Sequence, residues 1–480
     1  MNAIITAPAL RQLKDLPGPR GVPVFGNSFQ VNRAQIHVDM EHWAREYGPL
    51  FKVKLARATM LVVSDHALFG AIMKDRPNGF RRTPMLGIIA NELGLPQGLF
   101  SAEGDDWLRQ RRMVMASFAP SQVRAYFPSL VKVTLRLRER WALAAKAVQP
   151  INLQADLMRF TVDAIAGLAF GKDINTLQAG EDVIQRHLDK VLPAVFKRIF
   201  SIVPIWRYFK RASDRELEAS VAVIKNTIEE FVGQARQRLR DDPSLREQPR
   251  NLLEAMIAAA DQPDSGLGDR QVVGNVLTML LAGEDTTANT LAWMIHLLKQ
   301  NPKALQRVQD EVRTLAPDPS QFTMEMMDSL VYLEACASET MRLKPVAPFM
   351  PLQALRDTQV GDVAVARGTI VWGVMRHDSV REPYFSNPDA FEPERWLADA
   401  PNPLSTEAKR AAMPFGSGPR MCPGRYLALL EMKMAMAMLL SSFDIEAVDT
   451  PDGKPAEELM AFTMNPVGLT MRLKQHKQDA

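Results

Sequence analysis

The residue types most suited to chemistry occur in a Gly- and Pro-rich loop, Phe415-Gly-Ser-Gly-Pro-Arg-Met-Cys-Pro-Gly424. A helix is expected to follow over 425–441, so the Cys422 thiol lies at a helix N-terminus, whose partial positive charge favours a thiolate. Arg420 adds a cation two residues away, and Gly424 lets the backbone approach a bulky planar partner and point amides at the sulfur. An electron-rich thiolate held in this way suits axial ligation of haem iron.

Two other interpretations of this loop stay open on these residues alone. Cys422 is then either an incidental cysteine in a surface loop or a nucleophile, although no nearby histidine offers it a base. The second cysteine, Cys336, lies on the apolar side of an expected helix and is interpreted as a buried core thiol. The seven histidines form no HExxH or similar pattern, so we expect no zinc site.

A second candidate site lies in the middle of a long, weakly charged stretch over 271–298, at Ala282-Gly-Glu-Asp-Thr-Thr287. An acid beside an alcohol inside an apolar helix is costly unless the pair is used or partnered. Gly283 leaves room for a ligand against the helix, and a Thr hydroxyl can bond back to the preceding turn. The alternative interpretation is a solvated kink.

The elements that must position these residues are expected to be mainly helical with a minor β component. Helical patterns dominate from 105 to 314 and return over 324–343 and 425–441. A hairpin is expected from the β-rich runs 50–55 and 60–63. The other expected β elements are a hairpin over 359–375 with its turn at Arg367-Gly368, and strands near 443–448 and 467–473.

Composition narrows the class of protein. The chain has 480 residues, of which 46% are hydrophobic and 24% charged, which is typical of a globular protein. A net charge of +3 gives no bulk attraction to nucleic acid, and two cysteines exclude a disulfide framework, which makes the cytoplasm the expected location. Residues 1–16 lack an apolar run, and Glu284 and Asp285 interrupt the long stretch, so we expect a soluble protein without a membrane anchor.

The pattern Phe415-x-x-Gly418-x-Arg420-x-Cys422-x-Gly424 resembles the haem-binding loop of the cytochrome P-450 family. Three further segments resemble family motifs in the family's order: Trp107 to Arg111, Ala282 to Thr287, and Glu339 to Arg342. The resemblance therefore covers nearly the whole chain. It implies a cytochrome P-450 fold of soluble bacterial type, mainly α with a minor β region. Residues 1–480 would form a single large two-lobed domain, with 1–27 as an extended Pro-rich segment and haem between the long central helix and the Cys loop.

The resemblance also implies roles for individual residues. Cys422 is the expected metal ligand of haem b, and the pair Asp285 and Thr286 is expected to be catalytic. The other expected cofactor-binding residues are Trp107, Arg111, Ala282, Gly283, Phe415, Arg420 and Gly424. Glu339 and Arg342 are expected to form a structural network with Arg395. Where many relatives carry a basic residue that binds a haem propionate, this chain has Met350-Pro-Leu-Gln353, which leaves that contact in doubt.

The implied function is a haem-thiolate monooxygenase that inserts one atom of O₂ into a small hydrophobic substrate by hydroxylation or epoxidation. The alternatives are an enzyme that uses or rearranges peroxides, and a haem sensor without turnover. Apolar pocket walls are expected over 85–99, 196–206, 276–282, 346–349 and 462–464. No fused reductase is recognised, so the expected partners are a ferredoxin or flavodoxin with its reductase, and we expect a monomer. Basic residues within 107–140 and 409–433 are interpreted either as a docking patch for an acidic donor or as solvated helix faces.

Overall fold

A computed structural model describes residues 10–56, 58–171, 173–178, 183–201 and 203–476. The chain divides into two compact units. The first unit comprises Met1–Thr83, Ala347–Pro388 and Ser405–Met421, and the second comprises Pro84–Val346, Asp389–Leu404 and Cys422–Ala480. The boundary between Met421 and Cys422 falls inside the cysteine loop.

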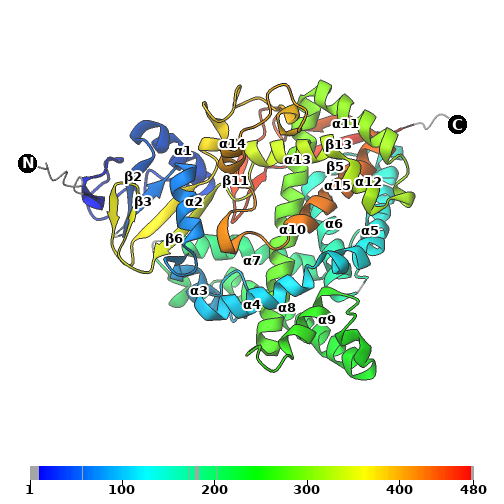
Figure 1. Cartoon of the computed structure of the whole chain (residues 1–480), viewed down its shortest axis with the longest axis horizontal. Helices are drawn as coiled ribbons and strands as arrows, with labels where there is room; N and C mark the ends of the chain where they lie inside the picture. The colour runs from blue at the N-terminus through cyan, green and yellow to red at the C-terminus, as the bar shows by residue number, and fades with distance from the viewer. Residues whose placement is uncertain (1–9, 57, 172, 179–182, 202, 477–480) are drawn as a thin grey trace, which may run out of the picture. The chain divides into compact units, whose positions relative to one another are not determined.

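The first unit is built on a five-stranded sheet with the order β2-β3-β9-β6-β4. The strands are β2 (Leu50–Leu55), β3 (Ala58–Val63), β4 (Phe80–Arg82), β6 (Phe349–Ala354) and β9 (Ile370–Val374). Figure 1 shows the blue β2 and β3 in one sheet with the yellow β6. The β3–β9 pair is parallel, with Met60 opposite Ile370, and the other pairs are antiparallel. The expected hairpin over 50–63 is therefore confirmed.

Smaller elements complete the first unit. They are β1 (Arg11–Gln12), β7 (Thr358–Val360), β8 (Val363–Val365), α1 (Ile36–Tyr47), α2 (His66–Lys74), α14 (Thr406–Ala411) and the short 3-10 helices η1 (Leu13–Asp15), η2 (Arg33–Gln35), η6 (Asp378–Val380) and η8 (Gly418–Arg420). An apolar core that includes Leu61, Phe69 and Val371 lies between the sheet and these elements.

The hairpin expected over 359–375 is wrong in its turn and its pairing. The hairpin joins β7 to β8, and its turn is at Gly361-Asp362, where Gly361 has φ +58. Glycine adopts this left-handed conformation without the strain that a side chain would cause. The strand after Arg367-Gly368, β9, pairs with β3 and β6 instead, because its apolar residues are buried in the larger sheet.

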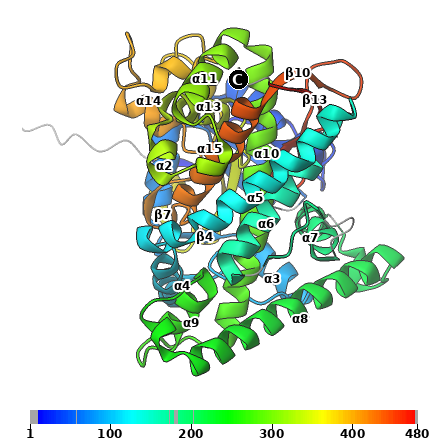
Figure 2. The same cartoon turned by 90° about the vertical axis from the view of Figure 1, so that its right-hand side faces the viewer.

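The second unit is mostly helical. Its longer helices are α3 (Pro84–Glu92), α4 (Gly104–Ser117), α5 (Pro120–Lys146), α6 (Leu153–Phe170), α7 (Val183–Ile199), α8 (Ala212–Asp241), α9 (Leu252–Ala260), α10 (Asp269–Gln300), α11 (Pro302–Leu315), α12 (Met324–Ser329), α13 (Val331–Leu343) and α15 (Arg425–Ser442). The 3-10 helices are η3 (Ile205–Arg207), η4 (Pro243–Arg246), η5 (Pro319–Gln321) and η7 (Pro393–Trp396). Figures 1 and 2 show α6 beside α10, and α6 packs along it. The helix expected over 324–343 breaks at Leu330 into α12 and α13.

The long central helix expected over 271–298 is confirmed as α10. Most of its side chains between Val272 and Leu298 are buried, as expected for a helix packed among other helices, and the middle around Ala282 is less buried. Asn301 caps its C-terminus, and Pro302 starts the next helix because proline lacks the amide that would continue α10. Within the described ranges, no helix is long and apolar enough to cross a membrane.

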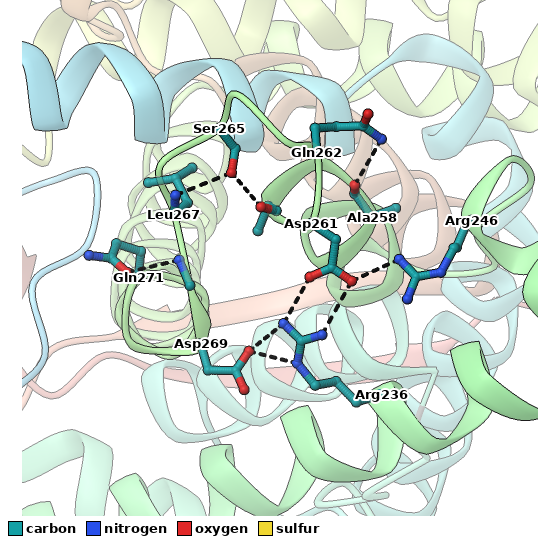
Figure 3. A network of polar contacts seen from close by, with 11 residues as sticks. Arg236, Arg246, Ala258, Asp261, Gln262, Ser265, Leu267, Asp269 and Gln271 are labelled. Atoms are coloured by element: carbon teal, nitrogen blue, oxygen red, sulfur yellow. Dashed lines mark hydrogen bonds and ion pairs between the residues drawn. The ribbon is translucent and has the colours of Figure 1, made fainter.

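An ion-pair network fixes the start of α10 (Figure 3). Arg236 on α8 donates to Asp269, the first residue of α10, at 2.7 Å and to Asp261 at 3.1 Å. Arg246 on η4 also donates to Asp261, at 2.7 Å. The acidic residue in the first turn of α10 also complements the helix dipole. The two arginines thus tie α8, η4 and the end of α9 to the helix that carries the acid–alcohol pair.

Two small sheets lie near the C-terminus. One has the order β10-β13-β5 and the other pairs β11 with β12. Their strands are β5 (Ile151–Asn152), β10 (Phe443–Asp449), β11 (Glu458–Met460), β12 (Met464–Pro466) and β13 (Thr470–Gln475). The strands expected near 443–448 and 467–473 are confirmed as β10 and β13, and β5, β11 and β12 were not expected.

Candidate active site around Cys422 and helix α10

Cys422 lies two residues before Gly424, the N-cap of α15. The Gly424 amide donates to the thiol sulfur, and the Arg111 cation lies close enough to act on it. Both effects lower the pKa of the Cys422 thiol, but burial has the larger effect and raises it. The sulfur therefore has an amide and a cation directed at it, as a thiolate ligand requires.

The Cys422 side chain is exposed. Desolvation nevertheless dominates its pKa, so enough protein surrounds the thiol to exclude most water. Cys336, by contrast, is fully buried in α13 and its thiol pKa is raised well above the usual value, which confirms its assignment to the core.

Trp107 and Arg111 lie one turn apart on α4, so their side chains leave the same face of the helix. Trp107 is 4% exposed. Asn275 on α10 positions α4: its Nδ2 donates to Gln110 on α4 at 2.8 Å, and its Oδ1 accepts from the Leu99 amide at 2.9 Å. Arg111 lies near enough to Cys422 for its charge to act on the thiol.

A glycine pair lets the segment before α4 approach α10 closely. A Cβ on Gly98 would lie 2.2 Å from the Gly274 carbonyl oxygen, and a Cβ on Gly274 would lie 2.2 Å from the Gln97 oxygen. Any side chain at either position would push the two backbones apart. Sequence reasoning missed this pair, because two isolated glycines 176 residues apart show no pattern that links them.

Phe415 and Arg420 belong to the first unit, together with the backbone of η8. Gly418 at the start of η8 has φ +71, and a Cβ there would lie 2.6 Å from the Met73 carbonyl oxygen at the end of α2. Glycine is therefore required at this position in the loop by both its conformation and its contact with α2. Phe415 and Arg420 precede Cys422 by seven and two positions in the sequence.

The motif on α10 has the back-bonded hydroxyl that the sequence suggested. Thr286 Oγ1 donates to the Ala282 carbonyl oxygen at 2.6 Å. The space left by Gly283 faces α6, because a Cβ on Gly283 would lie 2.2 Å from Ile165 Cδ1. The expectation that Gly283 leaves room for a ligand is therefore wrong, because its space is filled by the close packing of α6 on α10. Ala282 supplies the carbonyl that holds Thr286.

Asp285 has two direct partners. Its Oδ1 accepts from Asn289 Nδ2 at 2.7 Å, one turn along α10, and its Oδ2 accepts from the Thr463 hydroxyl. Burial is the largest effect on the carboxyl and raises its pKa, whereas the two donors lower it. A carboxyl with these opposed influences is a candidate for proton transfer.

The structure brings Glu339, Arg342 and Arg395 together. Arg342 donates to both Glu339 carboxylate oxygens, at 2.8 and 2.7 Å, and both side chains are completely buried. Arg395 Nε lies 3.2 Å from Glu339 Oε1. The bidentate geometry and the further donors offset the cost of burying these charges.

Two further partners of Glu339 were missed by sequence reasoning. Trp396 Nε1 donates to Glu339 Oε2 at 2.8 Å, and the Glu392 amide donates to Glu339 Oε1 at 2.9 Å. Trp396 follows Arg395 directly and Glu392 precedes Pro393, so the segment 392–396 around Arg395 could have indicated them. The network attaches η7 to α13.

Most basic residues of the segment 107–140 already have acidic partners. Arg109 pairs with Asp106, Arg124 with Glu325, Lys132 and Arg136 with Asp173, and Arg140 with Asp156. These pairs favour solvated helix faces for much of the segment. Arg112 is exposed and makes no ion pair with a described residue.

The residues of the second unit fit a haem group. Cys422 would supply a single sulfur ligand, and within the described ranges no group of three or more His, Cys, Asp and Glu side chains could hold a metal ion. A lone protein ligand suits a metal whose other donors come from a macrocycle. The cationic side chain of Arg111 and the indole N–H of Trp107 suit the carboxylates of such a macrocycle.

Comparison with known proteins identifies the class that this fold and thiolate define. The sequence profile of the family described as cytochrome P-450 matches residues 16–473. The chain therefore belongs to the cytochrome P-450 family, a class of haem-iron oxidoreductases. Three predictions from the sequence are confirmed at the level of the family. They are membership of the cytochrome P-450 family, a mainly helical fold with small sheets, and the class of haem-iron monooxygenases.

Similar curated proteins are diverse. The chain is 28% identical to "Self-sufficient cytochrome P-450 monooxygenase CYP505U2" of Exserohilum turcicum, over 98% of this chain and 43% of that protein. It is 26% identical to "Protein LUTEIN DEFICIENT 5, chloroplastic" of Arabidopsis thaliana, over 87% of this chain and 70% of that protein. It is 23% identical to "Cytochrome P-450 3A6" of Oryctolagus cuniculus, over 90% of this chain and 86% of that protein. The chain thus spans less than half the length of the fungal relative.

Proposed function

We propose that the protein inserts one atom of O₂ into a C–H or C=C bond of a small hydrophobic substrate. The overall balance for hydroxylation is RH + O₂ + 2e⁻ + 2H⁺ → ROH + H₂O, so the site must deliver two protons as well as two electrons. The observation that carries the proposal is the Asp285–Thr286 pair on α10, within the same compact unit as the Cys422 thiol.

In this proposal Cys422 would ligate the iron of haem b, and Trp107, Arg111 and Arg420 would hold its carboxylates. Phe415, Gly424 and Ala282 would contribute walls of the site. When bound, the haem iron supplies the binding and activation of O₂. Non-covalent haem b is supported by the sequence, since its two cysteines form no Cys-x-x-Cys-His attachment pattern.

The chain's own residues would manage the protons. Thr286 Oγ1 is held by the Ala282 oxygen and is accessible, so it is placed to donate or accept a hydrogen bond on the ligand side of α10. Asp285 would exchange protons with solvent and pass them toward the Thr286 hydroxyl. Positioned proton transfer typically contributes about 10²–10⁴-fold to a rate.

The electrons must come from a further redox group. The two cysteines of the chain cannot hold an iron–sulfur cluster, which needs four. We propose a ferredoxin or flavodoxin with its reductase as donor and a reducing, cytoplasmic setting, which the unpaired state of both cysteines supports. The apolar residues expected to line the pocket support a hydrophobic substrate.

The test is a reconstituted assay that measures NAD(P)H consumed, product and hydrogen peroxide together. Thr286→Ala should still bind haem and substrate and consume reducing equivalents, but product per NAD(P)H should fall at least tenfold while peroxide rises. Thr227→Ala, which removes a back-bonded hydroxyl on α8, is the matched control. Wild-type coupling in Thr286→Ala would contradict the proposed proton path. Product formed from added peroxide alone would favour a peroxide-using enzyme, and no product under any condition would favour a sensor.

A further inference from the structure

The acid of the acid–alcohol pair is held by a residue from a distant part of the chain. Thr463 lies in the turn between β11 and β12, and its hydroxyl donates to Asp285 Oδ2 on α10. Thr463 is 7% exposed, so water does not compete freely for this contact. Asn289 holds the other carboxylate oxygen, and the Gln154 side chain on α6 donates to Asn289 Oδ1 at 3.3 Å.

The β11–β12 turn is strained at the residue beside Thr463. Phe462 has φ +106, a conformation that residues with a side chain rarely adopt. The hairpin around it is well tied down: Met460 pairs with Met464, the Ala461 amide donates to the Thr463 oxygen at 3.0 Å, and the Met464 amide donates to Val346 at 2.8 Å. Strain of this kind persists only where surrounding contacts impose it, and it occurs preferentially at functional sites.

We propose that Thr463 is a positioning residue for the reaction, which holds the Asp285 carboxylate ionised and correctly oriented for proton transfer to the Thr286 side of α10. The inference rests on the proposed function for the identity of the reaction, although the contact itself does not. Neither oxygen of Asp285 is free to rotate, because Asn289 and Thr463 hold one each.

Other charged groups lie near Asp285, and they set the electrostatic surroundings in which the Thr463 hydroxyl contacts its carboxylate. Asp189 on α7 hydrogen-bonds to Glu284, the residue before Asp285, and the Asp285 charge acts on Asp189. Burial, together with that charge, raises the pKa of Asp189 to about 6. Arg159 on α6 is the cation that partly offsets these acids, and it acts on Asp189. Burial raises the pKa of Asp285, so the neutral donors Thr463 and Asn289 are the groups that oppose its protonation.

Removing the hydroxyl without changing the shape tests the proposal. Thr463→Val should raise the pKa of Asp285, because a donor to the charged form is lost while burial is unchanged. The acid limb of the pH profile for product per NAD(P)H should move up by about one pH unit. Thr463→Ser restores the donor and should return the profile to that of the wild type. A merely structural role would lower activity equally at all pH values and would not distinguish valine from serine.

A second readout does not depend on turnover. The carboxyl stretch of Asp285 in the haem-loaded protein can be assigned by its loss in Asp285→Asn and titrated by infrared difference spectroscopy. Its midpoint should rise in Thr463→Val and return in Thr463→Ser. Thr450→Val, which removes a hydroxyl that bonds to Lys454 in the loop after β10, should leave both readouts unchanged.

The two readouts separate this inference from the proposed function. An unchanged infrared midpoint in Thr463→Val overturns the inference whatever the enzyme does. A raised midpoint with no product from the wild type contradicts the proposed reaction but leaves the contact established. A raised midpoint with an unchanged pH profile would show that Asp285 ionisation does not limit coupling, which also overturns the positioning role.

Discussion

Cys422 is the residue on which the cofactor assignment depends. Its sulfur accepts from the Gly424 amide and lies near the Arg111 cation. Cys422→Ala removes the thiolate, so the reduced, CO-treated protein should lose the strongly red-shifted absorption band of thiolate-ligated haem. The measurement is the CO difference spectrum at equal protein concentration.

Cys336→Ser is the control for the cysteine replacement, because Cys336 is buried in α13 and should not affect the band. A wild-type band like that of a His-ligated globin would contradict thiolate ligation itself.

Single residues also show what a sequence can and cannot reveal. Cys422, Thr286 and Glu339 belong to short motifs, so local spacing identifies them. Thr463 contacts Asp285 across 178 positions, and only the folded chain brings them together. A lone threonine in a turn has no spacing or composition that indicates its partner, so sequence reasoning placed it only as a pocket residue.

At the level of elements, the buried Glu339 network holds two parts of the chain together, because it attaches η7 to α13. Glu339→Ala leaves Arg342 and Arg395 without their carboxylate inside the protein. Breaking a buried pair in this way costs about 3–5 kcal/mol. We expect a large loss of the free energy of unfolding and a low yield of haem-loaded protein, measured by denaturant unfolding and haem content.

Lys225→Ala is the matched control for Glu339→Ala. Lys225 lies 3.7 Å from Glu229 in an exposed pair on α8, and such pairs contribute only about 0–1 kcal/mol. Similar losses in the two variants would show that the Glu339 network has no special structural role.

Helix α15 contains a buried acid, Glu431, whose effect on the stability of the folded protein depends on pH. Glu431 is 2% exposed, and burial raises the pKa of its carboxyl to about 8. The folded protein therefore keeps a proton that the unfolded chain releases near pH 4.3. Stability from this group is fully present below that pH and is lost as pH rises toward 8. Glu431→Gln should remove this loss, so that it stabilises the protein by several kcal/mol at pH 8 and by much less at pH 5.

Thermal unfolding of wild type and Glu431→Gln at pH 5, 7 and 8 checks this expectation. The difference in Tm should widen with pH, whereas Glu446→Gln at an exposed position of β10 should show no such trend. A constant difference would mean that Glu431 is not protonated in the folded state.

Elements differ in how far their sequence determines them. The apolar run of α10 predicted a buried helix because nothing in it favours another structure. The strand β9 was placed in the wrong hairpin, since Arg367-Gly368 resembles a hairpin turn, yet β9 pairs with β3, more than 300 residues earlier. Strand pairing is decided by tertiary burial, which local turn signals do not report.

At the scale of the whole molecule, the net charge of +3 is nearly balanced, so any electrostatic attraction for a donor must be local. The ion pairs on α4, α5 and α6 neutralise most of the basic segment that the sequence suggested as a docking patch. Arg112 on α4 is exposed and makes no ion pair with a described residue, and it lies one position after Arg111. This exposed cation on α4 predicts moderate steering of an acidic donor.

Arg112→Glu tests this directly. Placing an acid there should slow electron transfer from an acidic ferredoxin or flavodoxin several-fold at low ionic strength, because a rim charge acts mainly on the association rate. The difference should shrink as salt approaches 1 M, where the Debye length falls to about 3 Å. Stopped-flow reduction of the CO-bound protein over a salt series gives the rates, and Lys303→Glu on α11 is the control for a general change in net charge. Equal slowing by the two variants would show that the donor responds to total charge and does not dock beside α4.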